Sequence, residues 1–197
     1  YDGLGRMTQS TCPYLFSTKY GYDAMGNLIS REDALGQTTN FTHDALRRLV
    51  SARSPMGHIT TFTYDSMGNP LGVTNPRGFP TSYGYDNMGR VSSILLPNGD
   101  SEAYTYDANG NLESRTDGEG GLTTYAYDAL NRVVSRTLPD NENFVYGYDA
   151  NGNLKYASRS FGKGNISLTY DALDRIIAET TDHGTFLRGI SYLYDRE

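Results

Sequence analysis

The chain has 197 residues, with 17 basic and 23 acidic side chains that leave a formal net charge of −6. This acidic balance argues against a duplex-binding surface, which would be basic, and no apolar run approaches the roughly 20 residues of a membrane-spanning helix. One cysteine, Cys12, excludes a disulfide framework and a multi-cysteine zinc site. With 17 Tyr, 22 Gly and no Trp, the composition favours a turn-rich β fold packed by tyrosine.

A Tyr-Asp pair recurs along the whole chain. The first eight units start 21 residues apart, with His43 in one Tyr slot, and self-similarity at a fixed period indicates a repeat architecture. We therefore expect one array over residues 1–197, with about nine units starting at positions 1, 22, 43, 64, 85, 106, 127, 148 and 170, and a partial unit at 194. The start at Tyr1, with neither an initiator Met nor a signal segment, suggests a piece of a longer polypeptide.

Each unit carries a first turn with a fixed residue pattern. The Asp is followed three residues later by Gly in six units and then by Asn or Arg in all nine. Asp at the first corner of a type I turn can accept backbone hydrogen bonds, and Gly tolerates the positive φ that closes such a turn. The predicted structural motif residues are Tyr22, Asp23, Gly26, Asn27, Tyr64, Asp65, Gly68, Asn69, Tyr85, Asp86, Gly89, Arg90, Tyr106, Asp107, Gly110, Asn111, Tyr127, Asp128, Arg132, Tyr148, Asp149, Gly152 and Asn153.

Three units replace that Gly by another residue. Asn131 and Asp174 are the best non-Gly residues for a left-handed conformation, whereas Arg47 is a strained substitute.

A second turn follows in each unit. It is marked by Pro13, Pro55, Pro76, Pro97 or Pro139, or by the Pro-less run 117–120. Between the turns lie short alternating stretches such as 60–64, and no segment has a helical period. Fifteen of the 17 tyrosines lie at the start of the Tyr-Asp pair or two residues before it, so both aromatic positions of a unit share one strand face. The sequence predicts an all-β fold of tandem 21-residue β-hairpins in a long curved antiparallel ribbon, with tyrosines stacked along it.

The polar rows of the repeat allow several interpretations. The Asp row could supply general acids or a calcium ladder, with 107–111 faintly resembling a calcium loop, but turn capping is favoured because the loop lacks its Glu ligand. The Asn/Arg row could bind an anion or a glycan, and a polar ladder across strands is favoured. His43 reads as an aromatic spacer, His58 and His183 have no second ligand at metal-binding spacing, and Cys12 has no partner for nucleophilic catalysis. We predict no catalytic residues, no cofactor and no metal.

The run Tyr-Asp-x-x-Gly-[Asn/Arg]-[Leu/Val], as in residues 22–28 and 85–91, closely resembles the Rhs/YD-repeat family over essentially the whole chain. That family includes bacterial Rhs polymorphic toxins, wall-associated proteins, the cocoon subunits of Tc toxins, and teneurins. The resemblance implies a ribbon that spirals into a hollow shell, which in bacterial members encloses a C-terminal toxic polypeptide. The family's Asp-Pro-x-Gly-type self-cleavage motif has no match here, and we expect no separate toxin or protease domain within these residues.

The leading hypothesis is therefore a non-catalytic segment of a toxin shell that is secreted, injected or held at a bacterial cell surface. The resemblance implies as partners the rest of a longer chain, including further repeats, a core-associated region and the toxin, and a capping or delivery protein. The alternative is a carbohydrate- or cell-surface-binding repeat module, because aromatic rows can stack on sugar rings, and a hydrolase is the third class. No nucleic-acid partner and no membrane span are expected.

Overall fold

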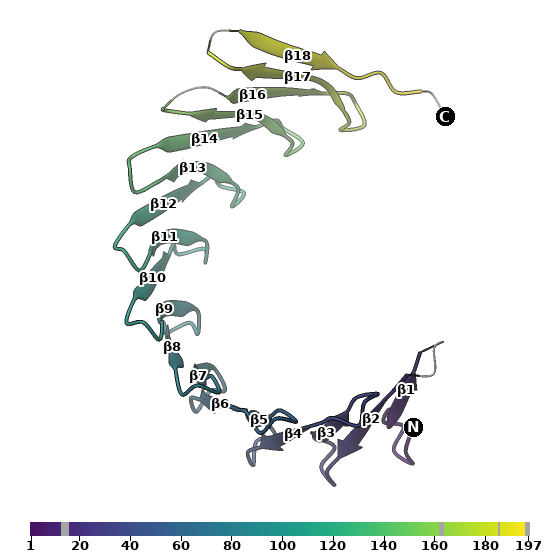
Figure 1. Ribbon diagram of the computed structural model, residues 1–197. Helices are drawn as coiled ribbons and strands as arrows, with labels where there is room; N and C mark the ends of the chain where they lie inside the picture. Colours follow the sequence, from purple (N-terminus) through teal and green to yellow (C-terminus); the bar gives the residue numbers. More distant parts are fainter. Residues whose placement is uncertain (13–15, 162–163, 185, 196–197) are drawn as a thin grey trace. The chain divides into compact units, whose positions relative to one another are not determined.

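The computed structural model describes residues 1–12, 16–161, 164–184 and 186–195 (Figure 1). It divides into two compact units, Tyr1–Asp100 and Ser101–Glu197. The first unit contains the strands β1 (Gln9–Thr11), β2 (Ser17–Tyr22), β3 (Leu28–Glu32), β4 (Thr38–His43), β5 (Leu49–Arg53), β6 (Ile59–Tyr64), β7 (Pro70–Thr74), β8 (Pro80–Tyr85) and β9 (Val91–Leu95). The second contains β10 (Ser101–Tyr106), β11 (Leu112–Thr116), β12 (Leu122–Tyr127), β13 (Val133–Thr137), β14 (Asn143–Tyr148), β15 (Leu154–Arg159), β16 (Asn165–Tyr170), β17 (Ile176–Asp182) and β18 (Leu187–Ser191).

Within each of the two compact units, every strand pairs antiparallel with the next strand in the chain. This holds from β1 to β9 and from β10 to β18. The described residues contain no helix, and none therefore that could cross a membrane. The predicted all-β class and its tandem antiparallel hairpins are confirmed.

The first turn of each repeat, which we call the Asp turn, spans five residues from the Asp to the Asn or Arg. In the turn at 65–69, the Gly68 amide donates to the Asp65 carbonyl at 3.2 Å, and the Asp65 amide donates to the Asn69 carbonyl at 2.9 Å. Gly68 has φ +96°. This is the three-residue hairpin loop in which a type I turn is followed by a left-handed residue.

The second turn has the same hydrogen bonds. In the turn at 75–79, the Gly78 amide donates to the Asn75 carbonyl at 2.9 Å, and the Asn75 amide donates to the Phe79 carbonyl at 3.1 Å. The turns marked by Pro55, Pro97 and Pro139 are closed in the same way. The turn predicted at Pro13 lies outside the described residues.

One irregularity accompanies the Asp turn and not the second turn. In the β2–β3 hairpin Tyr22 pairs with Leu28 but Gly21 pairs with Ser30, which leaves Ile29 without a partner. Eight hairpins of the described chain carry this register shift. An extra residue of this kind is a β-bulge, which bends the strand and increases its twist next to the turn.

The two faces of the ribbon differ in exposure. In β6, Thr60, Phe62 and Tyr64 are half-buried, and the alternate residues are exposed; β10 follows the same pattern. We call the half-buried side the tyrosine face. In the described residues no apolar side chain is fully buried, and Glu142, at 8% exposure, is the one buried residue. The packing is therefore spread along the ribbon and not gathered in a core.

Candidate functional site

The Asp turn is held by its own carboxylate. In the turn at 128–132, Asp128 Oδ1 accepts from the backbone amides of Leu130 at 2.9 Å and Arg132 at 3.0 Å. Its Oδ2 accepts from the Arg132 guanidinium Nε at 2.8 Å. The two backbone bonds recur at Asp2, Asp44, Asp65, Asp86, Asp107, Asp149 and Asp171. Three of the four lone-pair positions of each carboxylate are thus used inside the turn, which leaves little capacity for a metal ion or a substrate.

These hydrogen bonds act on the charge of the carboxylate. The Arg132 amide, and then its guanidinium, holds the pKa of Asp128 below its ordinary value. In the Asn-type turn the Asn111 side-chain amide is the main cause of the lowered pKa of Asp107. At Asp149 burial is the strongest single influence and opposes the shift, yet the combined hydrogen bonds still lower its pKa.

We expect acid to destabilise the ribbon through these groups. Nine Asp-turn carboxylates have lowered pKa values, so the unfolded chain binds more protons as the pH falls through their ordinary value of about 3.9. Their contribution to stability is fully present above that pH and is lost below it. Melting temperatures measured from pH 7 to pH 2.5 should be flat above pH 5 and should fall below about pH 4. An Asp107→Asn variant keeps an acceptor at this position, as Asn75 does in its own turn, so its melting temperature should fall less steeply with acid. A melting temperature that rises toward pH 3 would contradict the role given to these carboxylates.

The residue that closes the Asp turn alternates strictly between Arg and Asn from unit to unit. The series reads Arg6, Asn27, Arg48, Asn69, Arg90, Asn111, Arg132, Asn153 and Arg175. Sequence reasoning treated the two types as equivalent, although the alternation is visible in the sequence itself. The structural repeat is thus a pair of units.

The Arg side chain of the Asp turn can reach the backbone of the next turn, as Arg48 shows. Arg48 donates Nε to Asp44 Oδ2 at 2.7 Å and NH1 to the Asp65 carbonyl of the next turn at 2.8 Å. Its guanidinium also lies 4.8 Å from the ring centre of Tyr64. Asn69, in contrast, donates to its own Asp65 Oδ2 at 2.8 Å. The structure therefore differs from the predicted cross-strand ladder, because these side chains act within one turn or between successive turns.

The three non-Gly residues at the left-handed position also contact the preceding turn. Arg47, Asn131 and Asp174 have φ of 65°, 61° and 59°. Arg47 donates to the Met25 carbonyl, Asn131 Oδ1 accepts from Asn111 Nδ2 at 2.8 Å, and Asp174 Oδ1 accepts from the Asn153 amide group. These contacts between units offset part of the backbone strain that a side chain causes there.

The hydroxyl of the motif tyrosine forms a second link between units. Tyr148 Oη donates to the Val133 carbonyl at 2.9 Å, fifteen residues back in the preceding unit. Equivalent bonds are made by Tyr22, Tyr64, Tyr85, Tyr127, Tyr170 and Tyr194. The sequence suggested that the tyrosine rings stack on one another. Leaving Tyr106 aside, the stacked ring pair among the described residues is His183 with Phe186, so ring stacking does not join these tyrosines. Guanidinium contacts and hydroxyl bonds take its place.

His43 interrupts the hydroxyl row. It is half-buried, and its Nδ1 has no hydrogen-bond partner among the described residues. We expect His43→Tyr to supply the missing hydroxyl and to stabilise the protein by about 1 kcal/mol, the usual net value of one hydrogen bond. Urea denaturation measures the change, and His43→Phe, which adds the ring without the hydroxyl, is the matched control. A gain as large for Phe as for Tyr would attribute the effect to the ring alone.

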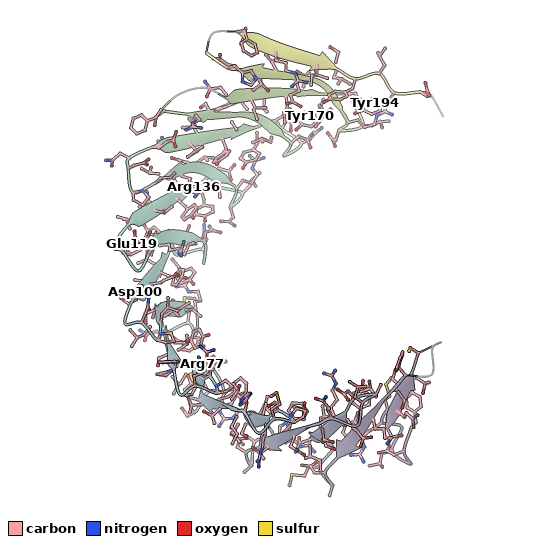
Figure 2. The ribbon with its side chains drawn as sticks, in the orientation of Figure 1. Arg77, Asp100, Glu119, Arg136, Tyr170 and Tyr194 are labelled. Atoms are coloured by element: carbon pink, nitrogen blue, oxygen red, sulfur yellow. The ribbon has the colours of Figure 1, made fainter. Side chains whose placement is uncertain are left out.

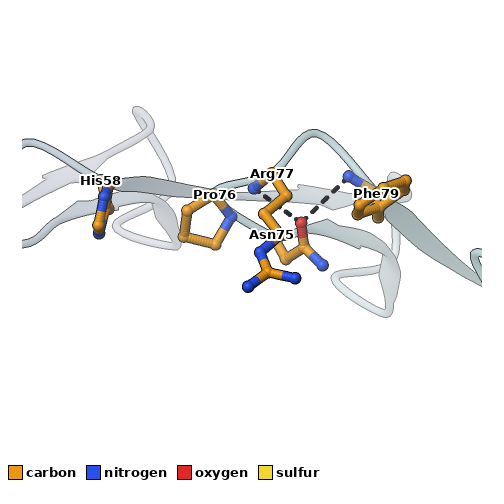
Figure 3. A pocket seen from close by; sticks show the side chains of 5 residues that line it. All are labelled: His58, Asn75, Pro76, Arg77 and Phe79. Atoms are coloured by element: carbon orange, nitrogen blue, oxygen red, sulfur yellow. Dashed lines mark hydrogen bonds between the residues drawn. The ribbon is translucent and has the colours of Figure 1, made fainter.

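A surface depression at the second turns brings several polar side chains together. His58, Asn75, Pro76, Arg77 and Phe79 border an open depression of 590 Å³. Asn75 Oδ1 accepts from the Arg77 amide at 2.9 Å and the Phe79 amide at 3.1 Å, so its acceptor holds the turn (Figure 3). The described residues of this lining include no carboxylate, hydroxyl or thiol that could act together with the His58 imidazole. No group of three or more metal-binding side chains occurs among the described residues, and Cys12 is exposed.

Tandem hairpins joined through Tyr-Asp turns define a structural β-repeat protein. The sequence profile described as Teneurin YD-shell matches residues 1–116, and the RHS Repeat profile matches residues 106–142 and 127–162. The chain belongs to the teneurin YD-shell family. No curated protein sequence matches it.

Solved structures are similar to this chain at low sequence identity, and the first of them, with a TM-score above 0.5, shares its fold. A crystal structure of TcdB2-TccC3 without the hypervariable C-terminal region is 15% identical with a TM-score of 0.55, covering 84% of this chain and 13% of that chain. The TcdB2-TccC3-TEV structure is 17% identical with a TM-score of 0.49, covering 99% of this chain and 14% of that one. A Photorhabdus luminescens Tc holotoxin pore is 14% identical with a TM-score of 0.40, covering 92% and 14%. The chain thus spans about a seventh of the length of the chains it matches.

Proposed function

We propose that residues 1–197 form one repeat array that serves as a non-catalytic wall segment of a shell. The shell would enclose a C-terminal toxic polypeptide of the same longer chain and help to deliver it. By this proposal the protein is secreted, injected or displayed at a bacterial cell surface, and a capping or delivery protein completes the assembly.

The observation that carries the proposal is the way in which the units are joined. Seven motif Tyr hydroxyls bond to the preceding unit, as Tyr148 does. The guanidinium groups of Arg6 and Arg48 bond to the following turn, and that of Arg132 lies over the ring of Tyr148 in the next unit. Because the described residues bury no apolar core, stability comes from neighbour contacts, as in other repeat arrays. Such a ribbon can extend into a wall without forming a catalytic cleft, and membership of the YD-shell family supports this role.

The test is made on the natural full-length chain that contains these residues. Electron microscopy should show a hollow shell with this segment in its wall, and the C-terminal polypeptide should resist added protease. A variant that breaks the wall, Tyr148→Ala, should expose that polypeptide to cleavage, whereas Glu119→Gln at an exposed second turn should not. A solid rod or a compact globule in the images would contradict the proposal.

No comparison supports the carbohydrate-binding alternative. A glycan array probed with the same protein separates the two: saturable binding that is lost on Tyr83→Ala with Tyr85→Ala would favour that alternative over the shell.

A further inference from the structure

The tyrosine face carries two pockets of the same construction, one in the compact unit Tyr1–Asp100 and the other in Ser101–Glu197. One, of 330 Å³, is lined by Phe62, Tyr64, Pro70, Val73, Tyr83, Tyr85 and Val91. The other, of 290 Å³, is lined by Tyr125, Val133, Arg136, Tyr146 and Tyr148. A shift of three repeats converts Phe62 into Tyr125, Pro70 into Val133 and Val73 into Arg136. The two pockets therefore share an aromatic frame, while one lining residue changes from valine to arginine.

Arg136 places a cation on this face. It lies on β13 (Figure 2), between Tyr125 on one neighbouring strand and Phe144 on the other. It is half-buried, and its Nε is buried without a hydrogen-bond partner among the described residues. Among the described residues, its guanidinium makes one cation–π contact, with the Phe144 ring, whose centre lies 5.9 Å away.

The equivalent arginine one repeat earlier shows what is missing. Arg115 NH2 donates to Glu102 Oε1 at 2.9 Å, and Tyr104 Oη donates to the same carboxylate. A buried N–H group without an acceptor costs free energy, and such groups in a folded protein call for an explanation. A carboxylate bound in the pocket beside Arg136 would provide the missing hydrogen-bond acceptor.

We infer that this pocket binds the carboxylate of an aspartate or glutamate side chain from the polypeptide that the shell encloses, with Arg136 as its hydrogen-bond donor. The three tyrosine rings would contact the methylene groups of that side chain and exclude water, which strengthens a charge-assisted hydrogen bond. The polypeptide as occupant rests on the proposed function. The charge of the occupant is inferred from Arg136 alone, since none of the described residues that line the pocket carries a carboxylate.

The experiment follows the side-chain Nε–H signal of Arg136 in a ¹⁵N-labelled sample of the chain by NMR. The peptide acetyl-Ala-Glu-Ala-amide should shift this signal saturably, and the Gln peptide should bind roughly tenfold more weakly or worse. The Nε–H signal of Arg115, already paired with Glu102, should not move. Equal shifts with the Glu and Gln peptides, or no shift with either, would overturn the inference.

The chain offers matched variants. Arg136→Val recreates the residue that the first pocket already holds, so it should fold, as checked by circular dichroism, and bind the Glu peptide at least tenfold more weakly. Val73→Arg should create a second site for the Glu peptide; no gain would overturn the role given to the tyrosine frame. Acetate that binds as tightly as the peptide would overturn the polypeptide as occupant and leave a simple anion site. These readouts do not depend on enclosure, so a solid particle in electron microscopy would remove the shell proposal without removing peptide binding.

Discussion

Replacing Tyr148 by alanine should lower the free energy of unfolding by about 2–3 kcal/mol, below the value for a fully buried aromatic residue because the ring is half-buried. The substitution removes the hydroxyl bond to Val133 and the face on which the Arg132 guanidinium lies, 4.4 Å from the ring centre. Since each unit is stabilised mainly by its neighbours, the loss should spread along the ribbon. Amide hydrogen exchange should accelerate in β13 and β14 and also in β15.

Two variants separate the parts of this effect. Tyr148→Phe keeps the ring and should cost about 1 kcal/mol for the lost hydroxyl bond. Tyr1→Ala, at a position 80% exposed, should change little. If alanine and phenylalanine at position 148 proved equally costly, the ring and its guanidinium contact would have no part in joining the units.

Replacing Gly68 by valine should cost more than about 1 kcal/mol, because a β-branched residue would be held at φ +96°. A Cβ at this position meets nothing within 4 Å, so the penalty comes from the backbone and not from a clash. The Asp65 turn should weaken, and thermal denaturation gives the change.

The control is Gly68→Asn. Asn131 occupies the same position of another Asp turn at φ 61°, so asparagine should be tolerated better than valine. Equal melting temperatures for the valine variant and the parent would show that this residue does not need the left-handed conformation.

The hairpins could be predicted because the residues that make them act locally. Asp, Gly and Pro at fixed spacing determine turns through their own backbone preferences, and the alternation in a strand such as β6 gives its faces. The bulge at Ile29 could not be predicted in this way, because an unpaired residue is defined only by the register of two strands.

Contacts between units were harder to predict than the units themselves. The alternation of Arg48 and Asn69 is legible in the sequence, but the reach of Arg48 to the next turn depends on how far apart successive turns lie. The unpaired Nε of Arg136 is a property of its neighbours, and the sequence shows only an arginine in a strand.

The alternation also governs how such a protein can change its length. Removing or duplicating a single unit would bring two turns of the same type together, either two Arg-type turns or two Asn-type turns, and the alternation would be broken at that point. Removing or duplicating a pair of units preserves every neighbour relation. Recombination within the gene, and any engineered shortening of the ribbon, should therefore be tolerated best in even numbers of repeats.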